Sequence, residues 1–331
     1  MKALVLESPK TSPIYKEVET PRPLEGEVLV NVEAAALNHR DLYICQGLYP
    51  GIVTPVILGS DASGIVVELG AKVDSKCLGR EVIINPNINW GTNPKVQDKH
   101  YNILGMPSNG TLAEFVCVKA DRLAPKPSHL NFAQAAALPL AGLTAYRALF
   151  TKADLKKGEK LLISGIGGGV ALIAFQMALA VGAEVWVTSG ADEKIELAQQ
   201  LGAKGGINYK TENWHKALEQ KAAGGFDVIL DSAGGDGFQY FLDLSNPAGR
   251  IVFYGGTSGS FKVNPQKMFW KQLTMFGSTM GDDIDFEKML ALINQYQIVP
   301  YVRDLRKLSE GAAAFADMDK GTQFGKLVLL P

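Results

Sequence analysis

The feature that most constrains the fold is a short aliphatic segment, Leu161–Ser164, that runs into the glycine-rich stretch Gly165–Gly169 and then into an apolar, helix-like segment. Glycines permit a sharp turn and leave no Cβ between the backbone and a phosphate, and the first turn of a helix offers unpaired N–H groups. The segment therefore predicts the pyrophosphate-binding turn of a dinucleotide site. Its match to G-x-G-x-x-G is partial, since Ile166 replaces the first glycine, and a tight turn without a ligand is the alternative. The residues expected at the phosphates are Gly167, Gly168, Gly169 and Val170.

The pattern of the chain changes near residue 130. Before it, short apolar runs are separated by turns that contain Pro and Gly, which is typical of an all-β, barrel-like unit, and the polar stretch 85–109 is expected to run over the surface. After it, strand-like runs alternate with helix-like segments as far as residue 254, and a further strand-like run covers 272–281. This alternation predicts a doubly wound parallel sheet, so the fold class is α/β. The tail is expected to add a helix from Phe286, an extended piece at Ile298–Val302, another helix and a last strand, Lys326–Leu330.

Charge and cysteine content exclude several classes of protein. The formal net charge is −1, which argues against nucleic acid or an anionic membrane as the main partner. No apolar run reaches the roughly 18 residues that a membrane span needs, and the N-terminus lacks a signal-peptide pattern. The three cysteines, Cys45, Cys77 and Cys117, are too widely spaced for a metal motif or a disulfide framework. We therefore expect a soluble, cytoplasmic protein.

The end of the second strand in the alternating region indicates which nucleotide binds. A carboxylate there would bind the ribose 2′-hydroxyl of NAD, but Ser189 occupies the position instead. Lys194 follows in the next helix and Tyr209 ends the third strand, so a 2′-phosphate could be received by two hydroxyls and a cation. Charge-assisted hydrogen bonds contribute about 1.5–3 kcal/mol each, which favours NADP(H). Asp192 and Glu193 lie close by and count against this choice, and an ordinary solvated Lys194 is the alternative.

With these residues in place, the whole chain resembles the medium-chain dehydrogenase/reductase superfamily, and within it the zinc-independent quinone oxidoreductase-like branch. The resemblance implies a GroES-like β-barrel catalytic domain at residues 1–126 and 282–331, and a Rossmann nucleotide-binding domain at residues 127–281. It also implies a homodimer that continues the Rossmann sheet at Gln272–Thr279, where an unpaired edge would be a liability. The resemblance rests on the order and spacing of the motifs Glu25–Val30, Asn38–Asp41, Gly47–Gly51, Gly59–Gly64, Gly110–Phe115, Leu143–Tyr146, Phe226–Asp231 and Gly325–Val328.

The same resemblance argues against zinc. Zinc-dependent alcohol dehydrogenases of this superfamily hold the metal with Cys and His ligands, and the matching positions here are Asn38, Ser60 with Asp61, and Leu140. An amide, a hydroxyl and an alkyl group do not make a tetrahedral site of thiolates and imidazoles. The stretch 85–109 matches the lobe that holds a second zinc, and it contains no cysteine. No metal site is therefore expected.

Without a metal, hydrogen-bond donors must stabilise the oxyanion that forms when hydride is added to a substrate. Asn38 occupies the position of the lost first ligand, and Tyr49 resembles the proton-donating tyrosine of related enoyl reductases, with Tyr43 behind them. Asn38 and Tyr49 are the expected catalytic residues; the alternatives are that Asn38 satisfies backbone groups and that Tyr49 caps an apolar wall. Arg40 and Asp61 could form an ion pair, and neither is assigned to the chemistry. The resemblance places nicotinamide contacts at Thr144, Gly255, Gly256 and Thr257.

Three functions remain open at this point. The first is NADPH-dependent transfer of hydride to a quinone or to an enone (α,β-unsaturated carbonyl). The second is a zinc-free alcohol or aldehyde oxidoreductase, and the third is a nucleotide-binding protein without turnover. Rates with panels of quinones, enones and aldehydes separate the first two, and NADPH binding without oxidation by any acceptor would indicate the third.

Overall fold

The computed structural model describes all 331 residues, and the chain separates into two compact units. The first contains Met1–Ala141 and Gly281–Pro331, and the second contains Gly142–Met280. Residues 127–141, which the sequence assigned to the nucleotide-binding domain, lie in the first unit. The reason is that α2 (Phe132–Ala136) packs its alanine Ala136 in one apolar cluster with Ala34 and Ala36 of the long strand β3.

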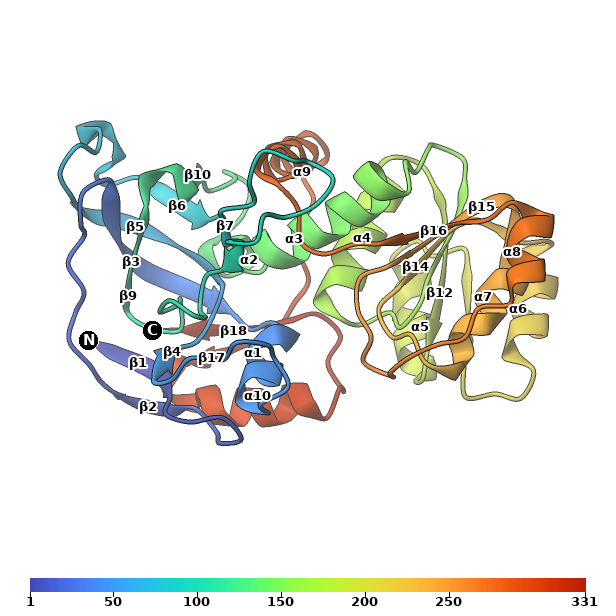
Figure 1. Cartoon of the computed structure of the whole chain (residues 1–331), viewed down its shortest axis with the longest axis horizontal. Coiled ribbons are helices and arrows are strands. Elements are labelled where there is room, and N and C mark those ends of the chain that lie inside the picture. The colour runs from blue at the N-terminus through green and yellow to red at the C-terminus, as the bar shows by residue number, and fades with distance from the viewer. The chain divides into compact units, whose positions relative to one another are not determined.

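The first unit is β-rich and is built from both ends of the chain (Figure 1). Its largest sheet has the order β10-β6-β5-β3-β18-β17, with β9 also paired to β3; a second sheet has the order β2-β1-β4, and β7 pairs with β8. Alternating apolar side chains of β3 and its neighbours fill one core, as period-two patterning requires. The strands are β1 (Lys2–Leu6), β2 (Ile14–Glu17), β3 (Glu27–Ala36), β4 (Val56–Ile57), β5 (Asp61–Leu69), β6 (Glu81–Ile84), β7 (Asn87–Ile88), β8 (Asn102–Ile103), β9 (Phe115–Lys119), β10 (Leu123–Pro125), β17 (Val302–Lys307) and β18 (Lys326–Leu330). The helices are α1 (His39–Cys45), α2, the start of α3 (Pro139–Tyr146), α9 (Asp283–Tyr296) and α10 (Gly311–Asp319).

Two parts of this unit differ from the sequence expectation. The extended piece of the tail is β17 rather than Ile298–Val302, because the Ile298 N–H still bonds back to the Ile293 carbonyl and so belongs to the end of α9. The stretch 85–109 is only partly a surface excursion. Its centre is exposed, but Asn85 and Asn87 are buried and donate to Asp283 Oδ1 at 3.0 and 3.3 Å, which ties the stretch to the first turn of α9.

The second unit is a six-stranded sheet whose neighbouring strands are all parallel, in the order β13-β12-β11-β14-β15-β16. Strand order reverses between β11 and β14, which is the arrangement of doubly wound dinucleotide-binding sheets. The expected α/β class with a Rossmann sheet is therefore confirmed (Figure 1). The strands are β11 (Lys160–Ile163), β12 (Glu184–Ser189), β13 (Gly205–Asn208), β14 (Phe226–Asp231), β15 (Ser245–Phe253) and β16 (Thr274–Gly277). The helices are α4 (Gly169–Ala180), α5 (Asp192–Gln200), α6 (Trp214–Ala222), α7 (Gln239–Leu244) and α8 (Pro265–Lys271), with one π-helical turn at Arg147–Lys152.

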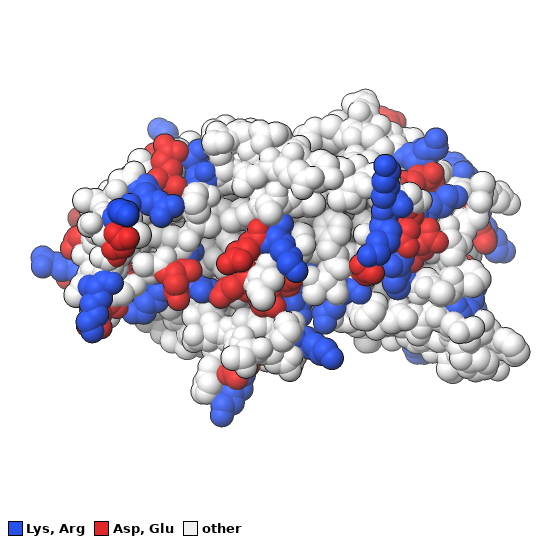
Figure 2. Space-filling model, turned by 90° about the horizontal axis from the view of Figure 1, so that it is seen from above, with Lys and Arg blue, Asp and Glu red and all other residues white.

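Basic and acidic side chains are mixed on the face of the molecule that Figure 2 presents, in keeping with 33 basic and 34 acidic residues in the chain. None of the helices combines the length and the apolar character that a membrane crossing requires.

Gly64 allows β5 to approach β3, and the approach is too close for any side chain. A Cβ on Gly64 would lie 2.0 Å from the carbonyl oxygen of Asn31, a backbone atom that cannot move without separating the strands. We predict that Gly64→Ala lowers the free energy of unfolding by about 1–3 kcal/mol. Gly237→Ala is the control, because a Cβ there meets nothing within 4 Å. Urea unfolding measures both variants, and equal loss of stability would contradict the steric account.

Candidate active site

Strand pairing brings three polar residues to one end of the large sheet in the first unit. Ala36, the last residue of β3, pairs with Asp61 on one side and with Val328 on the other. Asn38 follows β3 as the N-cap of α1, Asp61 begins β5, and Lys326 begins β18. The backbone N–H of Asn38 donates to Asp41 Oδ2 at 2.9 Å, so the first turn of α1 fixes this residue.

The side chains of Asn38, Asp61 and Lys326 form a closed hydrogen-bonded cluster. Lys326 Nζ donates to Asn38 Oδ1 at 2.5 Å and to Asp61 Oδ2 at 3.1 Å, and Asn38 Nδ2 donates to the same carboxylate oxygen at 2.9 Å. The three residues are 7%, 0% and 5% exposed in the order Asn38, Asp61, Lys326. Two opposite charges removed from water persist only when they are paired and hydrogen-bonded, which is the case here.

The positions that the resemblance matches to zinc ligands meet at this cluster, but they do not fit zinc. The Leu140 N–H donates to Asp61 Oδ1 at 2.8 Å, so Asn38, Asp61 and Leu140 are brought together. They offer one amide, one carboxylate already paired with an ammonium, and an alkyl side chain, where tetrahedral zinc needs thiolate or imidazole ligands. No group of three or more His, Cys, Asp or Glu residues in the chain could hold a metal ion.

Arg40 does not pair with Asp61, whose ionic partner is Lys326. Arg40 Nη1 donates to Ser60 Oγ at 2.7 Å and to the Leu104 carbonyl at 2.9 Å. The nearest carboxylate is that of Asp41, 3.8 Å away. Burial raises the pKa of Asp41, and the Arg40 charge opposes that shift. Ser60 Oγ also donates to the Leu104 carbonyl at 2.8 Å and so helps to anchor the segment that follows β8.

Tyr49 lies beneath the guanidinium of Arg40, which is 5.1 Å from the centre of the ring. Tyr49 is half-buried and packs against the core of the first unit. Tyr43 is also half-buried, 6.4 Å from the His39 ring, and burial raises the pKa of its phenol. A raised pKa makes Tyr43 a weaker acid, which counts against Tyr43 as a proton donor.

The glycine-rich turn of the second unit fits a pyrophosphate. Gly165 and Gly167 have φ values of 64° and 131°, which other residues rarely adopt. Gly168 is the N-cap of α4 and supplies no side-chain cap, and a Cβ on it would meet nothing within 4 Å. The first N–H groups of α4, from Gly169 and Val170 onward, are therefore open to an anion.

The residues expected near a 2′-phosphate lie at the ends of β12 and β13. Ser189 is buried, and its Oγ accepts the Ala191 N–H at 3.2 Å, which leaves its hydroxyl proton to donate. Tyr209 is exposed, and its hydroxyl lies so close to Gly190 that a Cβ there would be 2.7 Å away. Lys194 is partly buried in the first turn of α5.

One further cation lies at this strand end and was missed in the sequence. Lys210 Cε would lie 3.0 Å from a Cβ on Gly190, beside the Tyr209 ring. Its position directly after Tyr209 is the signal that could have identified it. Asp192, which counted against NADP(H), accepts a hydrogen bond from Asn208 Nδ2 at 3.1 Å through one of its two carboxylate oxygens.

The expected nicotinamide contacts all lie in the second unit. Gly255, Gly256 and Thr257 form an exposed loop after β15, and a Cβ on Gly255 would lie 2.4 Å from the Ser232 carbonyl oxygen. The loop is thus held against the end of β14, at the carboxyl ends of the parallel strands. Thr144 of α3 is buried, and its hydroxyl donates to Met280 Sδ at 3.8 Å.

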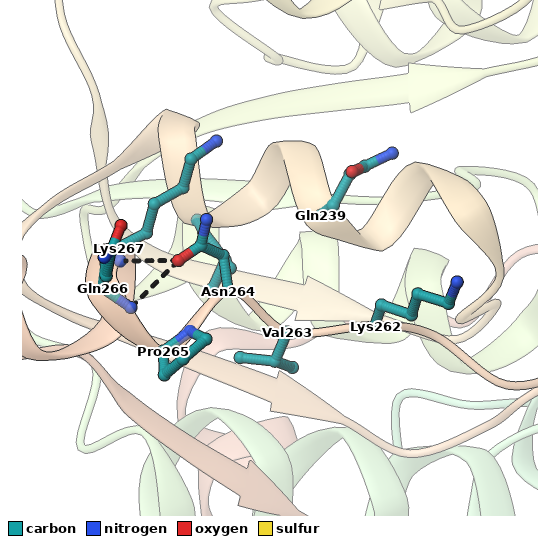
Figure 3. A pocket seen from close by; sticks show the side chains of 8 residues that line it. Gln239, Lys262, Val263, Asn264, Pro265, Gln266 and Lys267 are labelled. Carbon is teal, nitrogen blue, oxygen red and sulfur yellow. Dashed lines mark hydrogen bonds between the residues drawn. The ribbon is translucent and has the colours of Figure 1, made fainter.

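A shallow pocket elsewhere on the second unit contains none of these residues. Figure 3 shows it beside α7 and α8, lined by Gln239 and by the segment Lys262–Lys267, with Asn264 capping the first turn of α8. It has no titratable residue other than two lysines and no expected site residue, so we do not assign chemistry to it.

Comparison with known proteins is consistent with this geometry. Residues 24–128 match the alcohol dehydrogenase GroES-like domain, as expected for the first unit, and residues 169–295 match the zinc-binding dehydrogenase model. A zinc-type alcohol dehydrogenase-like protein, YogA, of Leptosphaeria maculans is 36% identical over 94% of this chain and 92% of its own. The quinone oxidoreductase of Mus musculus is 29% identical over 97% and 94%. A crystal structure of an NAD-dependent alcohol dehydrogenase is 31% identical, covers both chains completely and has a TM-score of 0.93.

The Asp61–Lys326 ion pair can be tested through the free energy of unfolding. Either Asp61→Asn or Lys326→Met leaves one buried charge without its partner, so each single variant should lose about 3–5 kcal/mol of unfolding free energy. The double variant removes both charges and should recover most of that loss, because no buried charge is left alone. Urea unfolding of the four proteins in the cycle measures the coupling. A double variant whose loss equals the sum of the single losses would show that the two side chains are not coupled.

Proposed function

The chain belongs to the medium-chain dehydrogenase/reductase superfamily, and within it we propose an NADPH-dependent oxidoreductase that reduces quinones or α,β-unsaturated carbonyls without zinc. The observation that carries the proposal is the buried cluster of Asn38, Asp61 and Lys326, which supplies hydrogen-bond donors and a fixed cation at two positions that the resemblance matches to zinc ligands. Similarity to a quinone oxidoreductase over nearly the whole chain supports the acceptor class.

The choice of NADPH rests on the ends of β12 and β13. The two hydroxyls of Ser189 and Tyr209, together with Lys194 and Lys210, supply donors and positive charge for a 2′-phosphate. The open turn before α4 would bind the pyrophosphate through backbone N–H groups of Gly167, Gly168, Gly169 and Val170. Thr144 and the loop of Gly255, Gly256 and Thr257 would bind the nicotinamide half.

The bound cofactor supplies a hydride, which is one proton with two electrons. Hydride added to the β-carbon of an enone, or to a quinone, moves the π electrons onto the carbonyl oxygen, and one proton completes the reduction. Asn38 donates one Nδ2 hydrogen to Asp61, and its second Nδ2 hydrogen is the donor for that oxygen. Tyr49 delivers the proton; its half-buried ring lies beside the Arg40 guanidinium.

A homodimer through β16 is part of the proposal. β16 is an edge strand that pairs only with β15, and the neighbouring helix α8 exposes Phe269 (59%) and Trp270 (79%). An open edge beside large exposed aromatic side chains is a surface that a second copy would cover. Sedimentation velocity at micromolar concentration should therefore show a dimer, and a Trp270→Lys variant should shift it to monomer. A wild-type monomer would remove this part of the proposal.

The free thiols support a reducing compartment. Cys45, Cys77 and Cys117 are all unpaired, and burial raises the pKa of Cys45 to about 12, so this thiol stays protonated and unreactive. Cytoplasmic localisation is the corresponding proposal, which fractionation of cells that produce the protein would test.

Cofactor preference follows from the cations at the strand ends. Lys194→Met and Lys210→Met should each weaken NADPH binding by about 10- to 100-fold, because each removes a charge-assisted contact with the 2′-phosphate, and should leave NADH binding unchanged. Lys204→Met, at an exposed lysine just before β13, is the control. Titration followed by NADPH fluorescence measures all four proteins. Wild type that binds NADH as tightly as NADPH would show that this strand end does not select the cofactor.

The proton donor can be tested with a matched pair of tyrosines. Tyr49→Phe should lower kcat for enone reduction by roughly 100-fold, because general acid catalysis is lost, with little change in NADPH binding. Tyr15→Phe, on the exposed face of β2, should keep the wild-type rate. Stopped-flow oxidation of NADPH by quinones, enones and aldehydes provides the assay. Turnover of aldehydes alone would favour an alcohol or aldehyde oxidoreductase, and NADPH binding without oxidation by any acceptor would indicate a non-catalytic protein.

A further inference from the structure

Lys326 is a buried cation of the first unit whose ammonium donates to Asn38, an expected catalytic residue. Its strand, β18, is otherwise entirely apolar: Leu327, Val328, Leu329 and Leu330 follow it. Lys326 is only 5% exposed, so its ammonium loses most of the hydration that a lysine at an exposed position would keep. A role confined to stability is therefore a costly explanation for it.

The hydrogen bonds of Lys326 determine which way the Asn38 amide points. An ammonium can only donate, so Asn38 must turn Oδ1 toward Lys326 Nζ, 2.5 Å away. An ionised carboxylate can only accept, so Asn38 must turn Nδ2 toward Asp61 Oδ2, 2.9 Å away. Both neighbours impose the same orientation, and the flipped amide would meet a donor with a donor and an acceptor with an acceptor.

In this orientation, the amide nitrogen of Asn38 keeps one hydrogen that can be donated to a substrate. Asn38 Nδ2 has two hydrogens and uses one of them for Asp61. The positive charge on the oxygen side draws electrons through the amide and makes the remaining N–H a stronger donor, as cooperative hydrogen-bond chains do. A preoriented donor of this kind costs no reorganisation when charge develops on a substrate oxygen.

We propose that Lys326 is the positioning residue of the active site, whose ammonium locks and polarises the Asn38 amide so that its free N–H stabilises the substrate oxyanion in place of a metal ion. The inference deepens the proposed function and rests on it. Lys326 acts through Asn38, and Asp61 supplies the counter-charge that allows the ammonium to be buried.

The test compares Lys326→Met and Lys326→Arg with Lys119→Met, a matched control at an exposed lysine of β9 in the same sheet. Lys326→Met should lower kcat for the best acceptor by roughly 30- to 100-fold with the KM of the acceptor and the Kd of NADPH unchanged, because the lost interaction is made in the transition state. Lys326→Arg keeps a cation that can only donate and should recover most of the rate. Lys119→Met should match wild type.

The double variant Lys326→Met with Asp61→Asn separates positioning from charge neutralisation. It contains no unpaired buried charge and folds if the stability cycle holds, so an effect that came only from an isolated Asp61 charge would disappear in it. The proposal requires kcat to stay low in the double variant, because nothing then fixes the Asn38 amide. Recovery of the wild-type kcat in the double variant, or a kcat of Lys326→Met within twofold of wild type, would overturn the positioning role alone. Wild type that binds NADPH and reduces no quinone or enone would overturn the proposed function and this role together.

Discussion

The buried ion pair between Lys326 and Asp61 is the interaction on which the first unit depends most. It joins residues 265 positions apart and so makes the last strand of the chain part of a site that begins with β3. Buried ion pairs add little net stability compared with apolar packing. They do disfavour other strand registers, because a shifted register would bury one charge without its partner. The pair therefore helps to specify the register of β18 beside β3. At the same place, Lys326 fixes the orientation of the Asn38 amide.

Glycine supports this arrangement wherever two backbones have to come close. Gly64 lets β5 lie against the Asn31 carbonyl three residues after Asp61, and Gly255 lets the loop after β15 rest on Ser232. Strand ends or helix starts hold Asn38, Asp61 and Lys326 of the first unit, and Ser189 and Gly168 of the second. Polar groups held in this way need little rearrangement when a ligand binds or when charge develops on it.

Most of the architecture was predictable from the sequence, whereas the central contact of the site was not. The glycine turn before α4 and the alternation of strands and helices were enough for the α/β class, since these are local signals. The motif Asn38–Asp41 was enough to select Asn38 as a candidate. Its hydrogen bonds with Asp61 and Lys326 are visible only in the structure. Lys326 was visible only as a lysine at the start of an apolar strand, because its partner lies at the other end of the chain and depends on strand order. The same reason explains why the pair that Arg40 and Asp61 could form is absent: Asp61 pairs with Lys326 instead.

The central claim is that a protein ammonium and an amide do the work that zinc does in related dehydrogenases. The most direct measurement is the metal content of purified, active protein, taken together with its rate of NADPH oxidation before and after exhaustive chelation. The account predicts zinc far below one equivalent per chain and an unchanged rate after chelation. One equivalent of zinc per chain, with activity lost on chelation and restored by zinc, would contradict it.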